Sequence, residues 1–151
     1  MDTCFVLYED WQMQCCGKRF GIKQTVTWPV LKFDARYIAD WWYLPFLSLS
    51  LGEITYLHEA HKKYCQDFLL IEGVVEKIYA IYAAREPHPT EPKANIRIPK
   101  LAVPADYADG WHKDINGLEL NAYFIALNDY TIRPALPADL TPYQGIYFDN
   151  E

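Results

Sequence analysis

The chain has 151 residues, of which 51% are hydrophobic and 16% aromatic, and its formal net charge is −6. This composition predicts one folded domain over residues 1–151 and excludes an intrinsically disordered chain. The excess of acidic side chains would repel phosphates, which disfavours a general nucleic-acid or anionic-membrane role and permits a basic protein partner.

Two features of the sequence indicate the compartment. The N-terminal MDTCFVLYED has no basic n-region, and the most apolar stretch, WWYLPFLSLSL, is short and interrupted by Pro45. Neither a signal peptide nor a membrane span is expected from these segments. We therefore expect a soluble cytoplasmic protein whose four cysteines are thiols or metal ligands rather than disulfides.

The first third of the chain predicts two strands. TCFVLYEDW, residues 3–11, is rich in β-branched and aromatic residues and predicts a strand. CCGKRFG follows as a connection, with Gly17 at positive φ. Apolar residues alternate with Lys and Thr over residues 22–33, which predicts a half-buried strand. Pro29 removes one ladder donor and predicts an edge or bulged strand. Residues 34–50 show mixed periodicity and are expected to be irregular.

Residues 51–65 allow two interpretations. Ser50 and Glu53 have the spacing of a capping box, and Ile54, Leu57 and Tyr64 follow at helical intervals, which favours a short helix. The same stretch also alternates in hydrophobicity, and its Ile-Thr pair is typical of a strand. We favour the helix.

The second half of the chain predicts mainly strands. Residues 67–83 are apolar on both faces and predict a central strand, with a bulge or bend at Gly73. We then expect an exposed proline-rich loop (85–95), a short strand (96–104), a loop ending in a turn (106–118), a strong strand (118–132) and a tail without regular structure. Five or six strands with at most one short helix predict a small antiparallel β-barrel, either OB-like or SH3-like.

Cysteine and histidine side chains indicate a possible zinc site. If residues 51–65 are helical, His58 and His61 point the same way, and one or two of Cys15, Cys16 and Cys65 could complete a tetrahedral structural site. LHEAH is one residue short of H-E-x-x-H, so metalloprotease catalysis is rejected. The competing interpretation is that the cysteines are small apolar residues at a turn. A thiol enzyme that pairs Cys16 with His58, His61 or His112 is the weakest hypothesis.

The aromatic residues suggest a binding face. Tryptophan and tyrosine commonly anchor peptide and protein interfaces, and an acidic rim would complement a basic partner. The alternative for any single ring is that it fills the core. The leading hypothesis is a non-enzymatic module that recognises a protein or peptide partner through an aromatic face. The candidate residues of this face are Trp11, Trp28, Trp41, Trp42 and Trp111.

DWQMQCCGKRF, together with the later TVTWPVL, resembles the opening of a family of short bacterial proteins of unknown function. That family has a similar W-Q-M-Q-C-C-G motif and a V-x-W strand, and GVVEKI is similar to a stretch of it as well. The resemblance covers this N-terminal block and one central strand. It implies a bacterial origin and carries no activity over. The motif residues suggest a functional site at this position: Trp11, Gln12, Cys15, Cys16 and Gly17. A strand-to-turn connection with strict geometric requirements would produce the same motif.

Overall fold

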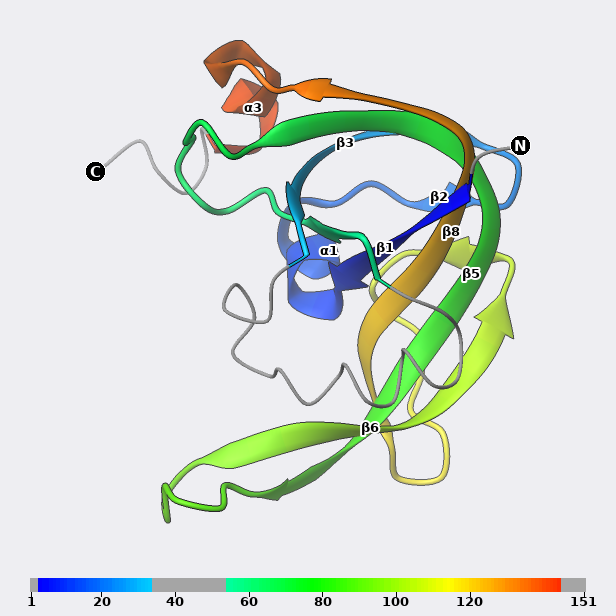
Figure 1. The fold of residues 1–151 in the computed structure, drawn as a ribbon. Coiled ribbons are helices and arrows are strands. Elements are labelled where there is room, and N and C mark those ends of the chain that lie inside the picture. Colours follow the sequence, from blue (N-terminus) through cyan, green and yellow to red (C-terminus); the bar gives the residue numbers. More distant parts are fainter. Residues whose placement is uncertain (1–2, 34–53, 145–151) are drawn as a thin grey trace.

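The computed structural model describes residues 3–33 and 54–144, and Figure 1 shows a strongly curved sheet with a short helix inside its curve. The side chains of Cys16 and of residues 141–144 lie outside the described part, as do Trp41, Trp42 and the segment 34–50 that was expected to be irregular. In chain order the elements are β1 (Thr3–Glu9), α1 (Asp10–Cys16), β2 (Phe20–Gly21), β3 (Thr25–Lys32), β4 (Tyr56–His58), β5 (Leu69–Pro87), β6 (Asn95–Ala105), β7 (Tyr107–Ala108), β8 (Glu119–Pro134) and α3 (Pro137–Gln144).

The mainly β fold is confirmed, but the sheet is mixed. Its six strands have the order β3-β4-β1-β8-β5-β6, and β3 also pairs with β5. The five strands β3, β4, β1, β8 and β5 are therefore paired in a closed ring, and β6 is attached to β5. Neighbouring strands are antiparallel except β1 and β4, which pair in parallel at Val6 and Tyr56. The predicted antiparallel barrel is thus not confirmed. β2 and β7 form a separate two-stranded sheet.

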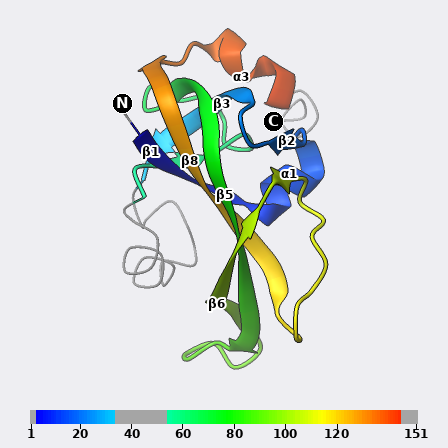
Figure 2. The same ribbon diagram turned by 90° about the vertical axis from the view of Figure 1, so that its right-hand side faces the viewer.

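β5 is the central strand, as predicted, and it pairs with β3, β6 and β8. Its register with β8 shifts at three places, and the first lies between Glu72 and Val74. Gly73 therefore occupies the predicted bulge, where a Cβ would lie 3.0 Å from the Cβ of Tyr130. Irregularities of this kind bend a strand and increase its twist. Figure 2 shows the resulting long curve, with the β5–β6 hairpin projecting away from the rest of the sheet.

The helix favoured for residues 51–65 is wrong. Residues 56–58 form β4, which lies between β1 and β3, and no helix is assigned to residues 54–65. Tyr56, Leu57 and His58 are all buried. Successive side chains point to opposite faces, and Tyr56 packs in one hydrophobic cluster while Leu57 packs in another, so both faces of β4 are covered. Pairing with β1, some 50 residues away, depends on tertiary structure that the local periodicity does not contain.

The prediction that Pro29 marks an edge or bulged strand is only partly right, because β5 pairs with Thr25–Val30 of β3 and β4 pairs with Val30–Lys32. β3 pairs with β5 along one side and with β4 along the other. The carbonyl oxygen of Pro29 accepts a hydrogen bond from the Glu59 N–H at 3.1 Å. The nitrogen and carbonyl of one strand residue point to the same neighbour, so the missing donor of Pro29 faces the position just beyond the end of β4. Such a residue pair normally exchanges two hydrogen bonds, and Pro29 cannot donate the second one, so β4 ends at this point.

Two helices occur where none was expected. The predicted first strand ends at Glu9, and α1 takes up the segment that was expected to be strand and connection. The tail forms α3, in which Leu140 is buried with Leu31, Phe68 and Ala135. Among the described residues, no helix is long and apolar enough to cross a membrane.

Candidate functional site

α1 is formed by the sequence DWQMQCC and organises three sets of contacts. Its central residues are acceptable helix formers, Asp10 lies in the first turn, and the N–H of Gly17 donates to the carbonyl of Met13 at 3.0 Å. Seven residues are too few for a stable isolated helix. Packing inside the curve of the sheet supplies the stability, because Met13 is 2% exposed and Gln12 is fully buried.

Gly17 ends this helix for a packing reason. Its φ is −80°, so the predicted positive φ is wrong. A Cβ at this position would lie 2.6 Å from both the Tyr8 hydroxyl and the Met13 sulfur. Glycine is therefore required by the close approach of these two side chains.

The buried side of α1 binds His58. The Gln12 amide oxygen lies 3.1 Å from Nδ1 of His58 and accepts a hydrogen bond from the Ala60 N–H at 2.8 Å. Because this oxygen only accepts, Nδ1 of His58 carries the proton. The imidazole stacks on Tyr8 with ring centroids 3.6 Å apart. Burial, assisted by the charge of His61, lowers the pKa of His58 to about 3, so the ring is neutral.

A second side of α1 carries Trp11 and Cys15, which lie one helical turn apart. The Cys15 sulfur is 2.8 Å from Nε2 of His61 and 3.3 Å from the Gln12 carbonyl oxygen. The indole of Trp11 contacts the same imidazole at a centroid distance of 4.6 Å. Burial lowers the pKa of His61. The predicted partners Cys15 and His61 are therefore brought together at the surface.

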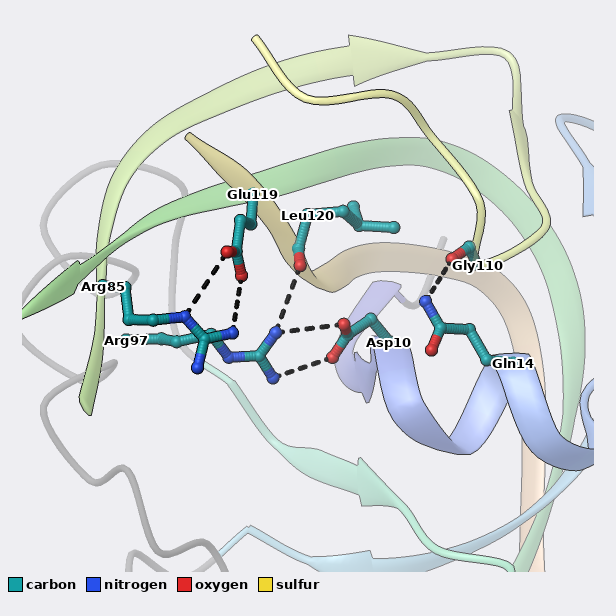
Figure 3. A network of polar contacts seen from close by, with 7 residues as sticks. All are labelled: Asp10, Gln14, Arg85, Arg97, Gly110, Glu119 and Leu120. Atoms are coloured by element: carbon teal, nitrogen blue, oxygen red, sulfur yellow. Dashed lines mark hydrogen bonds and ion pairs between the residues drawn. The ribbon is translucent and has the colours of Figure 1, made fainter. Parts of the chain in front are cut away.

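The third side of α1 faces a pocket of about 280 Å³, which we call the polar pocket because charged and polar side chains line most of it. Asp10 and Gln14 lie one turn apart on this side, as Figure 3 shows. Asp10 forms two hydrogen bonds of 3.1 Å with the Arg97 guanidinium, and Gln14 donates to the carbonyl of Gly110 at 2.8 Å. Other residues that line the pocket are Trp111, His112, Asp114 and Glu119.

The loop between β7 and β8 forms the opposite wall of the polar pocket. The Tyr123 hydroxyl accepts a hydrogen bond from the Gly110 N–H at 2.9 Å and lies 2.7 Å from Nδ1 of His112. The His112 ring also stacks on Tyr107 at 4.8 Å. Burial raises the pKa of Tyr123, so its hydroxyl stays protonated and can donate to His112. These contacts hold the loop in one arrangement.

The predicted site residues fall into different places. Trp111 is 67% and Trp11 41% exposed, whereas Trp28 is buried at 7%. His58 is buried against Gln12, whereas Cys15 is exposed beside His61. In the described part of the chain, no group of three or more His, Cys, Asp or Glu side chains is arranged to hold a metal ion.

Arg97 and Tyr123 did not emerge as candidates from the sequence. Arg97 lies in a strand that is mostly half-buried, and Tyr123 looks like any aromatic core residue of a strong strand. The one local signal was the turn-rich stretch DYADGWHKDINGL, which was interpreted as a solvated loop. In this stretch Trp111 and His112 lie between Asp109 and Asp114 in the sequence, and both line the polar pocket.

Comparison with known proteins adds a family to this geometry. A family model described as "Family of unknown function (DUF6578)" matches residues 2–129. The matched region contains α1 and every residue of the polar pocket. No curated protein and no solved structure matches the chain.

Proposed function

Because the chain belongs to a family of unknown function (DUF6578), we propose its function from the polar pocket: it is a non-enzymatic module that receives a lysine or arginine side chain of a protein or peptide partner. The observation that carries the proposal is Trp111. Its indole is 67% exposed beside the carboxylates of the pocket. Exposed tryptophans next to acidic side chains bind cations through the ring face and through charge together.

The charges of the polar pocket favour a cationic guest. Asp10 is neutralised by Arg97, and Glu119 is paired with Arg85 at 2.9 Å. Asp114 is exposed and forms no ion pair within the described part of the chain, so its carboxylate remains for a guest. The net charge of −6 would attract a basic partner over a longer range.

The loop presents Trp111 in a fixed arrangement. The N–H of Trp111 donates to a carboxylate oxygen of Asp109 at 2.8 Å, and its two neighbours contact Tyr123. The backbone that carries the indole is therefore already ordered, which reduces the conformational entropy lost on binding. Of the three residues of the expected aromatic face that the structure describes, Trp111 lines the polar pocket, whereas Trp28 is buried and Trp11 lies on another side of α1. The bacterial origin and the cytoplasmic location remain parts of this proposal.

Selection from a library of random displayed peptides tests the proposal. We expect the selected peptides to share a lysine or arginine, and a synthetic peptide with glutamine at that position to bind about tenfold or more weakly. Trp111→Ala and Asp114→Asn are each expected to weaken binding by about the same factor, and Trp11→Ala, the matched control, to leave it unchanged. Selected peptides without a basic residue, or full affinity in Trp111→Ala, would contradict the proposal.

A structural zinc site is the second candidate, and the Cys15–His61 distance of 2.8 Å favours it. Thiolate and imidazole are the ligands that zinc prefers. Cys15 and His61 would hold the ion together with Cys16; the predicted fourth ligand, His58, would first have to leave Gln12. Elemental analysis decides: near-stoichiometric zinc that survives dialysis and is lost in Cys15→Ser supports this candidate, and a metal-free dialysed protein excludes it.

A further inference from the structure

A second pocket lies beside the C-terminal end of α1 and has a different character. Its volume is about 360 Å³, within the range of small-molecule sites. It is lined by the segment that follows α1 and by the first half of β3. We call it the aromatic pocket, because Tyr8, Phe20 and Trp28 form its base.

The base of the aromatic pocket is a rigid cluster of three rings. Tyr8 meets Trp28 edge to face at a centroid distance of 5.4 Å, and Phe20 meets Trp28 at 5.0 Å. Each ring is less than 8% exposed, so all three are held by the core. The small part of each ring that reaches the pocket is therefore already in place, and a preorganised apolar surface favours an apolar guest.

The rim of the aromatic pocket is basic. Lys18 and Arg19 follow one another directly after Gly17, and both are exposed. The Arg19 guanidinium lies 4.1 Å from the centroid of the Tyr107 ring, which holds it at the rim by a cation–π contact. Two adjacent cations are notable in a chain whose net charge is −6.

Polar residues of β3 complete the rim without adding negative charge. Gln24, Thr25 and Thr27 line the pocket, and no carboxylate is among the lining residues that the structure describes. Glu72 accepts a hydrogen bond from Thr27 at 3.1 Å but is not part of the lining. The pocket therefore combines an aromatic base with a cationic mouth.

We propose that the aromatic pocket binds a small aromatic carboxylate, with its ring against Tyr8, Phe20 and Trp28 and its carboxylate between Lys18 and Arg19. Arginine pairs with carboxylates through two parallel hydrogen bonds, which orients the guest as well as attracting it. This site is separate from the polar pocket and does not depend on the function proposed there.

Titration of the protein with 1-naphthylacetate tests the proposal, with binding measured by isothermal calorimetry and by ¹H–¹⁵N NMR. We expect saturable binding, with shifts centred on the amides of Gly17, Arg19 and Val26. The neutral 1-naphthylacetamide is expected to bind about tenfold or more weakly, because it lacks the charge-assisted bonds. Sodium acetate, which has no ring, should not compete at equal concentration.

Substitutions locate the site. Arg19→Gln and Lys18→Gln are each expected to weaken naphthylacetate binding by about tenfold, since each removes one charge-assisted contact. The matched control is Lys93→Gln, in the exposed connection between β5 and β6, which projects away from α1 and β3 in Figures 1 and 2. Trp111→Ala should also leave this affinity unchanged, which separates failure here from failure of the peptide site. Equal binding of acid and amide, or shifts elsewhere in the protein, would overturn the proposal.

Discussion

Asp10 and Arg97 are 87 positions apart in the sequence, and two hydrogen bonds of 3.1 Å join the first residue of α1 to β6 (Figure 3). The Asp10 side chain is 8% and the Arg97 side chain 23% exposed. The same figure contains a second arginine–carboxylate pair, Arg85 with Glu119, which is 55% and 37% exposed. The two pairs differ mainly in burial and form a matched comparison.

Removing Arg97 is expected to destabilise the protein strongly. Arg97→Ala leaves the buried Asp10 carboxylate without its counter-charge, which costs roughly 3 kcal/mol of unfolding free energy. Arg85→Ala should cost at most about 1 kcal/mol, because exposed ion pairs are screened by water. Urea unfolding at pH 7 measures both values. Equal losses in the two variants would show that burial does not set the strength of the Asp10–Arg97 pair.

His58 is expected to make the stability fall in mild acid. Burial keeps its pKa near 3 in the folded protein, against an ordinary value of 6.5. Between these values the unfolded chain binds the additional proton, so the free energy of unfolding decreases as the pH falls below about 6.5, by up to about 1.4 kcal/mol per pH unit. Above that pH, both states hold the ring neutral and this contribution is constant.

The variant His58→Gln isolates that contribution, because it keeps an amide donor for Gln12 and removes the titrating ring. Unfolding by urea at pH 7, 6 and 5 should give a shallower pH dependence in the variant than in the parent. All other titratable groups are the same in both proteins. Parallel curves would mean that His58 is not the group responsible.

Cys15 is expected to be a far more reactive thiol than Cys4. Cys15 is exposed beside the His61 imidazole, whereas Cys4 is 3% exposed and burial raises its pKa to about 12. In a Cys16→Ser background at pH 7.5, iodoacetamide should alkylate Cys15 much faster than Cys4, since burial both blocks access to Cys4 and leaves it little thiolate. Mass spectrometry of the digested protein gives both rates.

His61 should contribute to this reactivity. His61→Gln removes the nearby base and is expected to slow alkylation of Cys15 severalfold, whereas His88→Gln, in the β5–β6 connection, should not change it. Alkylation of Cys4 and Cys15 at similar rates in the folded protein would contradict the assignment. An unchanged rate in His61→Gln would leave exposure alone as the cause.

Gly110 is expected to tolerate substitution less well than Gly117. Both have positive φ, of 86° and 80°, so alanine is strained at each by about 1 kcal/mol. A Cβ on Gly110 would also lie 2.8 Å from Cγ of Met13 in α1, whereas nothing lies within 4 Å of a Cβ on Gly117. Thermal unfolding should therefore show a larger loss for Gly110→Ala, by roughly 1–3 kcal/mol. Equal losses would mean that the loop does not pack against α1 as described.

The main strands could be predicted because their signals are local. Residues 67–83 and 118–132 are long, apolar and rich in β-formers, and they became the centre of the sheet. The bulge at Gly73 and the turn before β8, where Asn116 and Gly117 have positive φ, follow from residues with special backbone freedom. In each case the information lies within a few neighbouring residues.

The sequence by itself determined the mainly β class and the central strand. It also indicated that a cysteine and a histidine could lie close together. Only the tertiary structure decided that DWQMQCC is a helix, because packing of Met13 and Gln12 inside the sheet stabilises a segment too short to be helical alone. It likewise decided that residues 56–58 form a strand and that Asp10 meets Arg97. These outcomes depend on contacts between distant segments, and such contacts leave no periodic trace in either segment.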